Sequence, residues 1–254
     1  MNSPISRMGG KKLLVPQLLK RFPEKPPDKY VEVFGGAGWL LFASDRHAPL
    51  EVFNDVDGEL INLFRCMKYH AGELQREIRW VLNSREMFAD AKEQQACRGF
   101  TDIQRAAQYF LIVKLSYGSD ARTYGGSKKN LTKAREYLTA VQQRLEGVRI
   151  EHKDFQALIK QFDGAGTLFF LDPPYLGAED YYDAVFTIDD HLRLRDALRV
   201  IKGQFLLTYN DNPQVWEWYR GFQIEAVDRN NNLTGRYQST RQDSKYHELI
   251  IRNY

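Results

Sequence analysis

The residues Asp172-Pro173-Pro174-Tyr175 bring together groups that can bind and orient a planar aromatic amine. They follow residues 167–171, an apolar run typical of a buried strand. Because two prolines cannot continue a sheet, we expect the chain to leave it here, at the carboxyl edge where ligands bind in open α/β folds. The Asp172 carboxylate and the Pro173 carbonyl could each accept one amino hydrogen, aiming the nitrogen lone pair at an electrophile, while Tyr175 stacks on the ring. A rigid turn with an exposed tyrosine is the alternative interpretation.

A glycine-rich turn, Phe34-Gly35-Gly36-Ala37-Gly38, is the second candidate ligand site. It lies between a predicted strand over 30–34 and a predicted helix over 38–44. Glycines there let the backbone turn sharply and approach a ligand with no side chain in the way. Leu41 stands where the NAD fingerprint has its third glycine, so the turn favours a nucleoside-type cofactor other than a nicotinamide.

Asp55 is the acidic partner expected for such a turn. It comes 20 residues after Gly35, at the end of a second predicted strand over 51–54. A carboxylate at this place can accept hydrogen bonds from both hydroxyls of a ribose. The alternative is that Asp55 caps the following helix, a role that Asp57 could fill equally well.

Short apolar strands that alternate with helices predict a parallel sheet to position these two loops. From about residue 72 to 146 the alternation stops, and the sequence predicts helices interrupted by a loop over 117–130. We therefore predict a catalytic and cofactor-binding α/β domain formed by residues 1–70 and 147–254, with a helical insertion over 71–146. The remaining predicted elements are helices over 13–22, 58–69, 155–162 and 188–201, strands over 148–151, 167–171 and 204–209, and a terminal hairpin over 222–227 and 246–252.

The composition is that of a folded protein, with 43% hydrophobic and 27% charged residues among 254. A net charge of +3 permits a nucleic-acid partner without requiring one. No apolar run approaches the roughly 18–20 residues of a membrane span, and residues 1–12 lack an apolar signal core, so we expect no membrane association and a cytoplasmic location. Cysteines and histidines show no metal-ligand spacing, so we predict no metal site.

Five segments of the chain carry a resemblance to a known family. They are Arg7-Met8-Gly9-Gly10-Lys11, the glycine turn over 34–38, Asn54-Asp55-Val56-Asp57, Asp154-Phe155, and the loop over 172–175. In these motifs and in their order, the chain resembles the Dam-like (D12 class) DNA adenine N6-methyltransferases over essentially its whole length. The resemblance implies a Rossmann-like methyltransferase sheet with an antiparallel last strand, and it makes the insertion over 71–146 a small, mostly helical DNA-recognition element.

The resemblance also implies a methyl donor and roles for individual residues. The cofactor would be S-adenosyl-L-methionine, and the activity site-specific transfer of its methyl group to N6 of an adenine flipped out of double-stranded DNA. The residues implied to bind the cofactor are Arg7, Lys11, Phe34, Gly35, Gly36, Gly38, Asp55, Asp154, Phe155 and Asp172. The residues implied in catalysis are Asp172, Pro173, Pro174 and Tyr175.

A basic segment within the insertion is the candidate DNA-binding element. Between residues 114 and 135, six lysines and arginines stand against a single acid, with tyrosines and glycines between them. Lysines could contact phosphates there, while an arginine or tyrosine reaches the bases. The predicted DNA-binding residues are Tyr117, Arg122, Tyr124, Lys128, Lys129 and, in the later polar segment over 229–245, Arg236. A solvated surface loop and an exposed hairpin tip are the alternatives.

Other functions stay open at this point. The same chemistry could act on adenine in RNA or on N4 of cytosine in DNA, although cytosine enzymes more often carry serine than aspartate before the two prolines. A catalytically silent nucleic-acid-binding relative is a third hypothesis, against which the intact Gly35, Gly38, Asp55 and loop over 172–175 argue. We expect a monomer on DNA, with a restriction endonuclease of the same system as a candidate partner.

Overall fold

The computed structural model of the chain describes residues 1–7, 9–126, 130–177, 186–230 and 245–254. In these residues, seven strands form one sheet in the order β3-β2-β1-β4-β5-β7-β6. Strands β1 to β5 run parallel, whereas β7 is antiparallel to both β5 and β6, which confirms the predicted Rossmann-like sheet. The strands are β1 (Lys29–Glu32), β2 (Leu50–Asn54), β3 (Val148–Glu151), β4 (Thr167–Leu171), β5 (Gln204–Asn210), β6 (Gln223–Asn230) and β7 (Lys245–Arg252).

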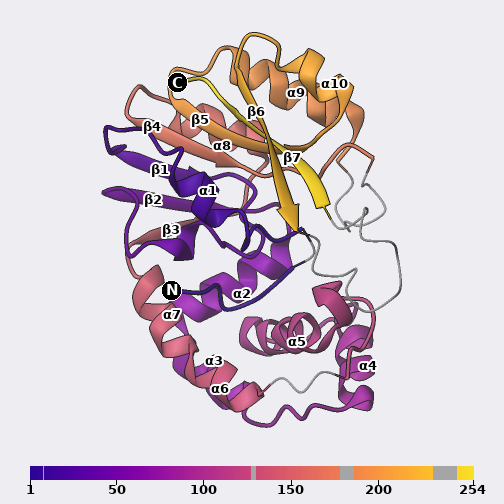
Figure 1. The fold of residues 1–254 in the computed structure, drawn as a ribbon. Coiled ribbons are helices and arrows are strands. Elements are labelled where there is room, and N and C mark those ends of the chain that lie inside the picture. Colours follow the sequence, from indigo (N-terminus) through magenta and orange to yellow (C-terminus); the bar gives the residue numbers. More distant parts are fainter. Residues whose placement is uncertain (8, 127–129, 178–185, 231–244) are drawn as a thin grey trace.

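Both faces of the central strands are buried under helices, as parallel strands require. All five residues of β4 are buried, and they alternate between two hydrophobic clusters: Leu168 and Phe170 join one, Phe169 and Leu171 the other. The helices that contribute to the first cluster include α1 (Val15–Leu19) and α2 (Gly58–Tyr69), and those of the second are α8 (Phe155–Phe162), α9 (Ile188–Arg199) and α10 (Pro213–Trp218). The sheet thus separates two layers of helices (Figure 1).

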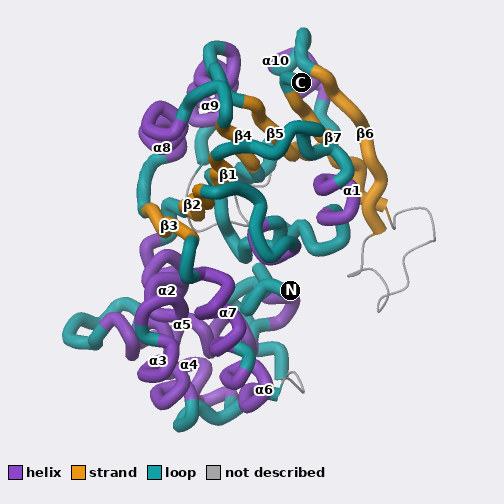
Figure 2. Tube along the Cα trace, turned by 90° about the vertical axis from the view of Figure 1, so that its left-hand side faces the viewer, coloured by secondary structure: helices purple, strands orange, loops and turns teal. Residues whose placement is uncertain are grey.

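Between β2 and β3 the described chain is helical. Figure 2 shows these helices gathered at one end of the molecule, beyond the edge of the sheet. They are α2, α3 (Ala71–Ile78), α4 (Arg85–Gln94), α5 (Asp102–Leu115), α6 (Leu131–Glu136) and α7 (Leu138–Leu145), with a short 3-10 turn, η2 (Tyr117–Ser119), after α5. Helices α2, α3 and α4 all pack on α5. A target-recognition role for residues 71–146 stays a prediction.

Several elements have the bounds that the apolar pattern predicts, among them α2, α8, β3 and β4. Helix α10 was not expected, although its start carries a recognisable signal: Asn212 caps it by accepting a hydrogen bond from the Gln214 N–H, and Pro213 occupies the first turn. Among the described residues, every helix is too short or too polar to cross a lipid bilayer.

The helix predicted over 38–44 is wrong, because only a 3-10 turn, η1 (Leu41–Ala43), forms there. Gly38, with φ +70°, is left-handed and Ser44 is extended, so neither can belong to a regular helix. Arg144 of α7 then binds carbonyls that the segment leaves unpaired. Its guanidinium donates to the Leu41 carbonyl at 2.7 Å and to the Ser44 carbonyl at 2.9 Å. The same side chain pairs with Glu51 of β2, and both groups are buried. The backbone at the two ends of the segment therefore limits it to a short turn, which Arg144 holds against β2 and α7.

Candidate active site

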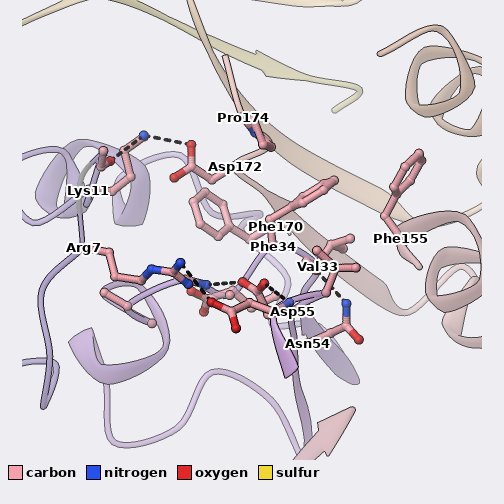
Figure 3. A pocket seen from close by; sticks show the side chains of 18 of the residues that line it. Arg7, Lys11, Val33, Phe34, Asn54, Asp55, Phe155, Phe170, Asp172 and Pro174 are labelled. Carbon is pink, nitrogen blue, oxygen red and sulfur yellow. Dashed lines mark hydrogen bonds and ion pairs between the residues drawn. The ribbon is translucent and has the colours of Figure 1, made fainter. Parts of the chain in front are cut away.

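A cavity of about 450 Å³ lies at the carboxyl edge of the sheet, where β1 and β4 are neighbours. The chain leaves these two strands toward opposite sides of the sheet, which is where open α/β folds bind their ligands. Figure 3 shows the side chains around the cavity. All ten predicted cofactor residues line it: Arg7, Lys11, Phe34, Gly35, Gly36, Gly38, Asp55, Asp154, Phe155 and Asp172. The glycine turn and the Asp172 loop, far apart in sequence, therefore share one cavity.

The turn after β1 depends on its glycines for close packing. A Cβ at Gly35 would lie 2.4 Å from ring carbons of Phe53 and 2.8 Å from the Asn54 carbonyl, so no side chain fits. Gly36 has φ +50°, a left-handed conformation that favours glycine, and a Cβ there would meet nothing within 4 Å. The backbone at this turn is thus packed on one side and open on the other, which suits the close approach of a ligand.

Asp55 braces the glycine turn from the end of β2. One carboxylate oxygen accepts the Gly36 N–H at 2.8 Å, and the other accepts the Asp57 N–H at 2.9 Å. Asp57, rather than Asp55, caps helix α2, because its side chain accepts the N–H groups of Glu59 and Leu60. Burial raises the pKa of Asp55 above its usual value, against the opposing effect of the nearby Arg7 charge.

Arg7 reaches the cavity from the N-terminal segment, but its guanidinium binds protein. It pairs with the Asp57 carboxylate at 3.0 Å, and the same Asp57 oxygen accepts the Tyr109 hydroxyl at 3.0 Å. Since Asp57 caps α2 and Tyr109 belongs to α5, this group of three side chains links the N-terminal segment, the acidic loop and the helical part of the chain.

Aromatic rings form another wall of the cavity. Phe34 lies 5.7 Å from both Phe155 and Phe186, measured between ring centroids, and these last two are 5.6 Å apart. Asp154 caps α8 through the N–H groups of Gln156 and Ala157, and it pairs with Arg193 at 3.0 Å. The wall offers flat apolar surface against which a heteroaromatic ring could lie.

Asp172 follows β4 and has one carboxylate oxygen that is held in place. Its Oδ1 forms an ion pair with the Lys11 ammonium at 2.8 Å and accepts a hydrogen bond from the Thr208 hydroxyl at 2.7 Å. Lys11 is only 5% exposed and also donates to the Gly9 carbonyl at 3.0 Å. The second oxygen, Oδ2, has no hydrogen-bond partner among the described residues. The carboxylate is therefore oriented by protein groups and keeps an acceptor available.

The rest of the loop lies around this carboxylate. Pro174 lines the cavity, whereas Pro173 and Tyr175 are not among the residues that line it. The Tyr175 ring stacks on Tyr209, with centroids 6.1 Å apart, and the Lys11 ammonium lies 4.6 Å from the Tyr175 centroid. Tyr175 thus sits beside Asp172 with its ring packed against residues of the N-terminal segment and β5.

Two residues at this site were not found from the sequence: Thr208 and Glu32. Glu32, the last residue of β1, lines the cavity and is 1% exposed. Burial raises its pKa from 4.5 to about 8, although the Tyr30 hydroxyl donates to it at 2.9 Å. Only the position at a strand end beside the glycine turn could have drawn attention to it.

We expect Glu32→Gln to gain stability relative to the wild type as the pH rises from about 5 to 8. The pKa of Glu32 is higher in the folded than in the unfolded chain, so the stability present below the unfolded value is lost as the pH rises through this window. Each pH unit corresponds to at most about 1.4 kcal/mol, so the Tm difference between variant and wild type should widen by several degrees. Thermal melts at several pH values measure it, with Glu73→Gln at an exposed position as the control. A difference that is constant with pH would contradict a buried, protonated Glu32.

The predicted DNA-binding residues have different surroundings. Tyr117 is 54% exposed, and Arg122 is exposed as well. Tyr124 is half-buried: its ring packs 5.6 Å from Phe88, and its hydroxyl donates to Asn83 at 2.9 Å. Lys128, Lys129 and Arg236 lie outside the described residues. Tyr117 and Arg122 are thus accessible to a ligand, whereas Tyr124 attaches the loop to α4 and the residues before it.

Comparison with known proteins gives the family. The type II methyltransferase M1.LlaDCHI of Lactococcus lactis subsp. cremoris is 27% identical over an alignment of 277 positions, which covers 97% of this chain and 93% of that protein. A crystal structure of a Thermoplasma acidophilum protein overlaps 72% of this chain and 95% of its own, at 11% identity and a TM-score of 0.28, too low to indicate a shared fold. Residues 8–233 match the family described as D12 class N6 adenine-specific DNA methyltransferase. The chain therefore belongs to the D12 class of N6 adenine-specific DNA methyltransferases.

Proposed function

We propose that this protein transfers the methyl group of S-adenosyl-L-methionine to N6 of an adenine that is flipped out of duplex DNA. One observation carries the proposal: a single cavity contains both the glycine turn braced by Asp55 and an Asp172 carboxylate with an available oxygen. The cofactor and the target amine would thus meet in one cavity, as direct transfer requires.

The residues present fit this cofactor. Asp55 holds two backbone N–H groups and, as a carboxylate, retains lone pairs that can accept ribose hydroxyls. The open side of Gly36 would take the adjoining part of the cofactor, and Phe34 and Phe155 would flank its adenine ring. When bound, S-adenosyl-L-methionine supplies a methyl group on a positively charged sulfur, which makes the methyl carbon electrophilic.

Asp172 and Pro173 would orient the target amine. The free Oδ2 of Asp172 accepts one N6 hydrogen and the Pro173 carbonyl accepts the other, so that the nitrogen lone pair points along the line of attack. Such alignment of reactants can contribute about 7–11 kcal/mol to catalysis. Asp172 need not be a strong base, because the amine proton becomes acidic once the nitrogen carries the methyl group. Tyr175 would have to turn from its packing against Tyr209 and Lys11 to stack on the base, and this stacking would offset part of the few kcal/mol that base flipping costs.

The helical part between β2 and β3 would recognise the DNA. Its exposed Tyr117 and Arg122 follow α5, whose Tyr109 belongs to the Arg7–Asp57 group beside the cavity. A protein that binds duplex DNA through this segment would place base-contacting side chains near the site of methyl transfer. This supports the proposal that residues 71–146 form the target-recognition insertion.

We expect the double variant Lys128→Ala/Lys129→Ala to bind DNA more weakly and with a flatter dependence on salt. Each lysine–phosphate contact contributes about 0.9 to the slope of log affinity against log salt concentration, so the slope should fall by about 1–2. Fluorescence anisotropy with duplex DNA at several salt concentrations measures it. Lys160→Ala/Lys202→Ala, at exposed positions on α8 and after α9, is the matched control. An unchanged slope in the first variant would remove these lysines from the interface.

The function is tested by offering the protein duplex DNA and structured RNA separately, each with labelled S-adenosyl-L-methionine. We expect label in duplex DNA and little in RNA. Preferential labelling of RNA would favour an RNA adenine methyltransferase, and absence of cofactor binding in calorimetry would favour a catalytically silent relative. Either result would overturn the proposal.

A further inference from the structure

The last three residues of β5 each contact a different part of the loop that follows β4. The Thr208 hydroxyl donates to Asp172 Oδ1 at 2.7 Å, the Tyr209 ring stacks on Tyr175, and the Asn210 amide donates to the Leu176 carbonyl at 3.0 Å. Strands β4 and β5 are parallel neighbours, in register up to Leu171 and Leu207. The loop therefore leaves the sheet directly alongside these three residues.

Thr208 differs from Lys11, which pairs with the same carboxylate oxygen, in how directly the backbone places it. Its side chain is completely buried within a strand, and a β-branched side chain has a stiff χ1 torsion. Lys11 reaches Asp172 through a long side chain with several rotatable bonds from outside the sheet. A short hydroxyl on a rigid strand fixes the plane of the carboxylate more closely than an ammonium on a flexible stem does.

The neighbouring side chain keeps this end of β5 rigid. The Tyr209 hydroxyl and His191 Nδ1 share a hydrogen bond of 2.5 Å, and both residues are completely buried. His191 belongs to α9 and meets the edge of the Phe186 ring, with centroids 4.7 Å apart. The end of β5 is thus anchored to the helix layer behind it, and the loop is positioned against a fixed support.

We propose that the end of β5 sets the geometry of the catalytic loop, and that Thr208 is a positioning residue for the Asp172 carboxylate. By holding Oδ1, the hydroxyl turns Oδ2 toward the target amine. The inference rests on the proposed role of Asp172 in methyl transfer, and it adds a residue that touches neither the cofactor nor the base.

The test is Thr208→Val, which keeps the branched shape and removes only the donor. We expect the single-turnover rate of methyl transfer to fall by about ten-fold or more, since misplacing a reacting group by 1 Å can cost about a hundred-fold. Binding of S-adenosyl-L-methionine and of duplex DNA should change by less than about three-fold, because Thr208 contacts neither. Thr208→Ser restores the hydroxyl and should recover most of the rate. A purely structural role would not separate rate from binding in this way.

Thr167→Val is the matched control. Thr167 is also buried, lies in the adjacent strand, and donates from its hydroxyl to the Phe162 carbonyl at 2.8 Å, at the opposite end of the sheet. We expect a comparable loss of thermal stability with an unchanged rate. If Thr208→Val does not fold, Thr208→Ala provides the same comparison with a smaller side chain.

The outcomes separate this inference from the proposed function. A wild-type rate in Thr208→Val, or no recovery in Thr208→Ser, would overturn the positioning role while an inactive Asp172→Ala leaves the proposed function intact. Near wild-type activity of Asp172→Ala would instead overturn the proposed function and, with it, the role given to Thr208.

Discussion

Replacing Asp172 with alanine is expected to lower the rate of methyl transfer by roughly a hundred- to a thousand-fold or more, the scale seen when a single oriented polar group is removed from an active site. Among the four residues 172–175, the variant loses the one charged side-chain acceptor, which a hydrogen bond from Thr208 and an ion pair with Lys11 hold in place. The amine would keep the Pro173 carbonyl alone, and its lone pair would no longer be aimed. Single-turnover kinetics with saturating cofactor and duplex DNA measures the change.

Stability has to be checked in the same variant, because Lys11 is 5% exposed and would lose its counter-charge. Removing one partner of a buried ion pair is destabilising, although the partial exposure of Asp172, 18%, lessens the effect. Asp172→Asn is the matched control for shape: its one oxygen would face Lys11 and Thr208 and its NH2 group the target amine, so we expect a better-folded protein that is still nearly as inactive as alanine. A folded Asp172→Ala protein with a rate within a few-fold of wild type would refute the catalytic assignment.

Replacing Asp55 with alanine is expected to weaken cofactor binding about a hundred-fold or more while DNA binding changes little. Two hydrogen bonds to a carboxylate are worth about 1.5–3 kcal/mol each, so the loss of both ribose contacts is a large effect. The variant also removes the acceptor for the Gly36 N–H, which braces the glycine turn. Isothermal titration calorimetry for the cofactor and anisotropy for duplex DNA separate the two affinities.

The pH dependence of cofactor binding provides an independent check on Asp55. Burial raises the pKa of Asp55, so its ionised form is lost at a higher pH than an exposed aspartate would require. Cofactor affinity should therefore fall on acidification in the wild type and be nearly independent of pH in Asp55→Ala. Equal losses of cofactor and DNA affinity in that variant would indicate general misfolding rather than a ribose contact.

The strand-end motifs were predictable because their signals are local. The glycine turn and the loop at 172–175 each directly follow an apolar strand, and the parallel order of β1 and β4 then brings them to one cavity. Asp55 was predicted from the same kind of signal, at the end of β2. The sequence allowed either Asp55 or Asp57 to cap the next helix, and the structure shows that Asp57 does so.

What could not be predicted depends on contacts between distant parts of the chain. In place of the helix expected over 38–44, a left-handed Gly38 and an extended Ser44 leave only a 3-10 turn, and the carbonyls of Leu41 and Ser44 bind Arg144, about a hundred positions away. Thr208 carries no local motif, and its contact with Asp172 requires the register of β4 against β5. Tyr124 is a further example: the sequence predicts a DNA contact, but in the structure its hydroxyl donates to Asn83 of the protein.

The most direct test of the account is to identify the methylated nucleoside. Duplex DNA is incubated with the purified protein and labelled S-adenosyl-L-methionine, digested, and analysed by mass spectrometry. We expect label in N6-methyladenine at a defined sequence, and its loss with Asp172→Ala. Label in N4-methylcytosine, or undiminished N6-methyladenine with Asp172→Ala, would contradict it.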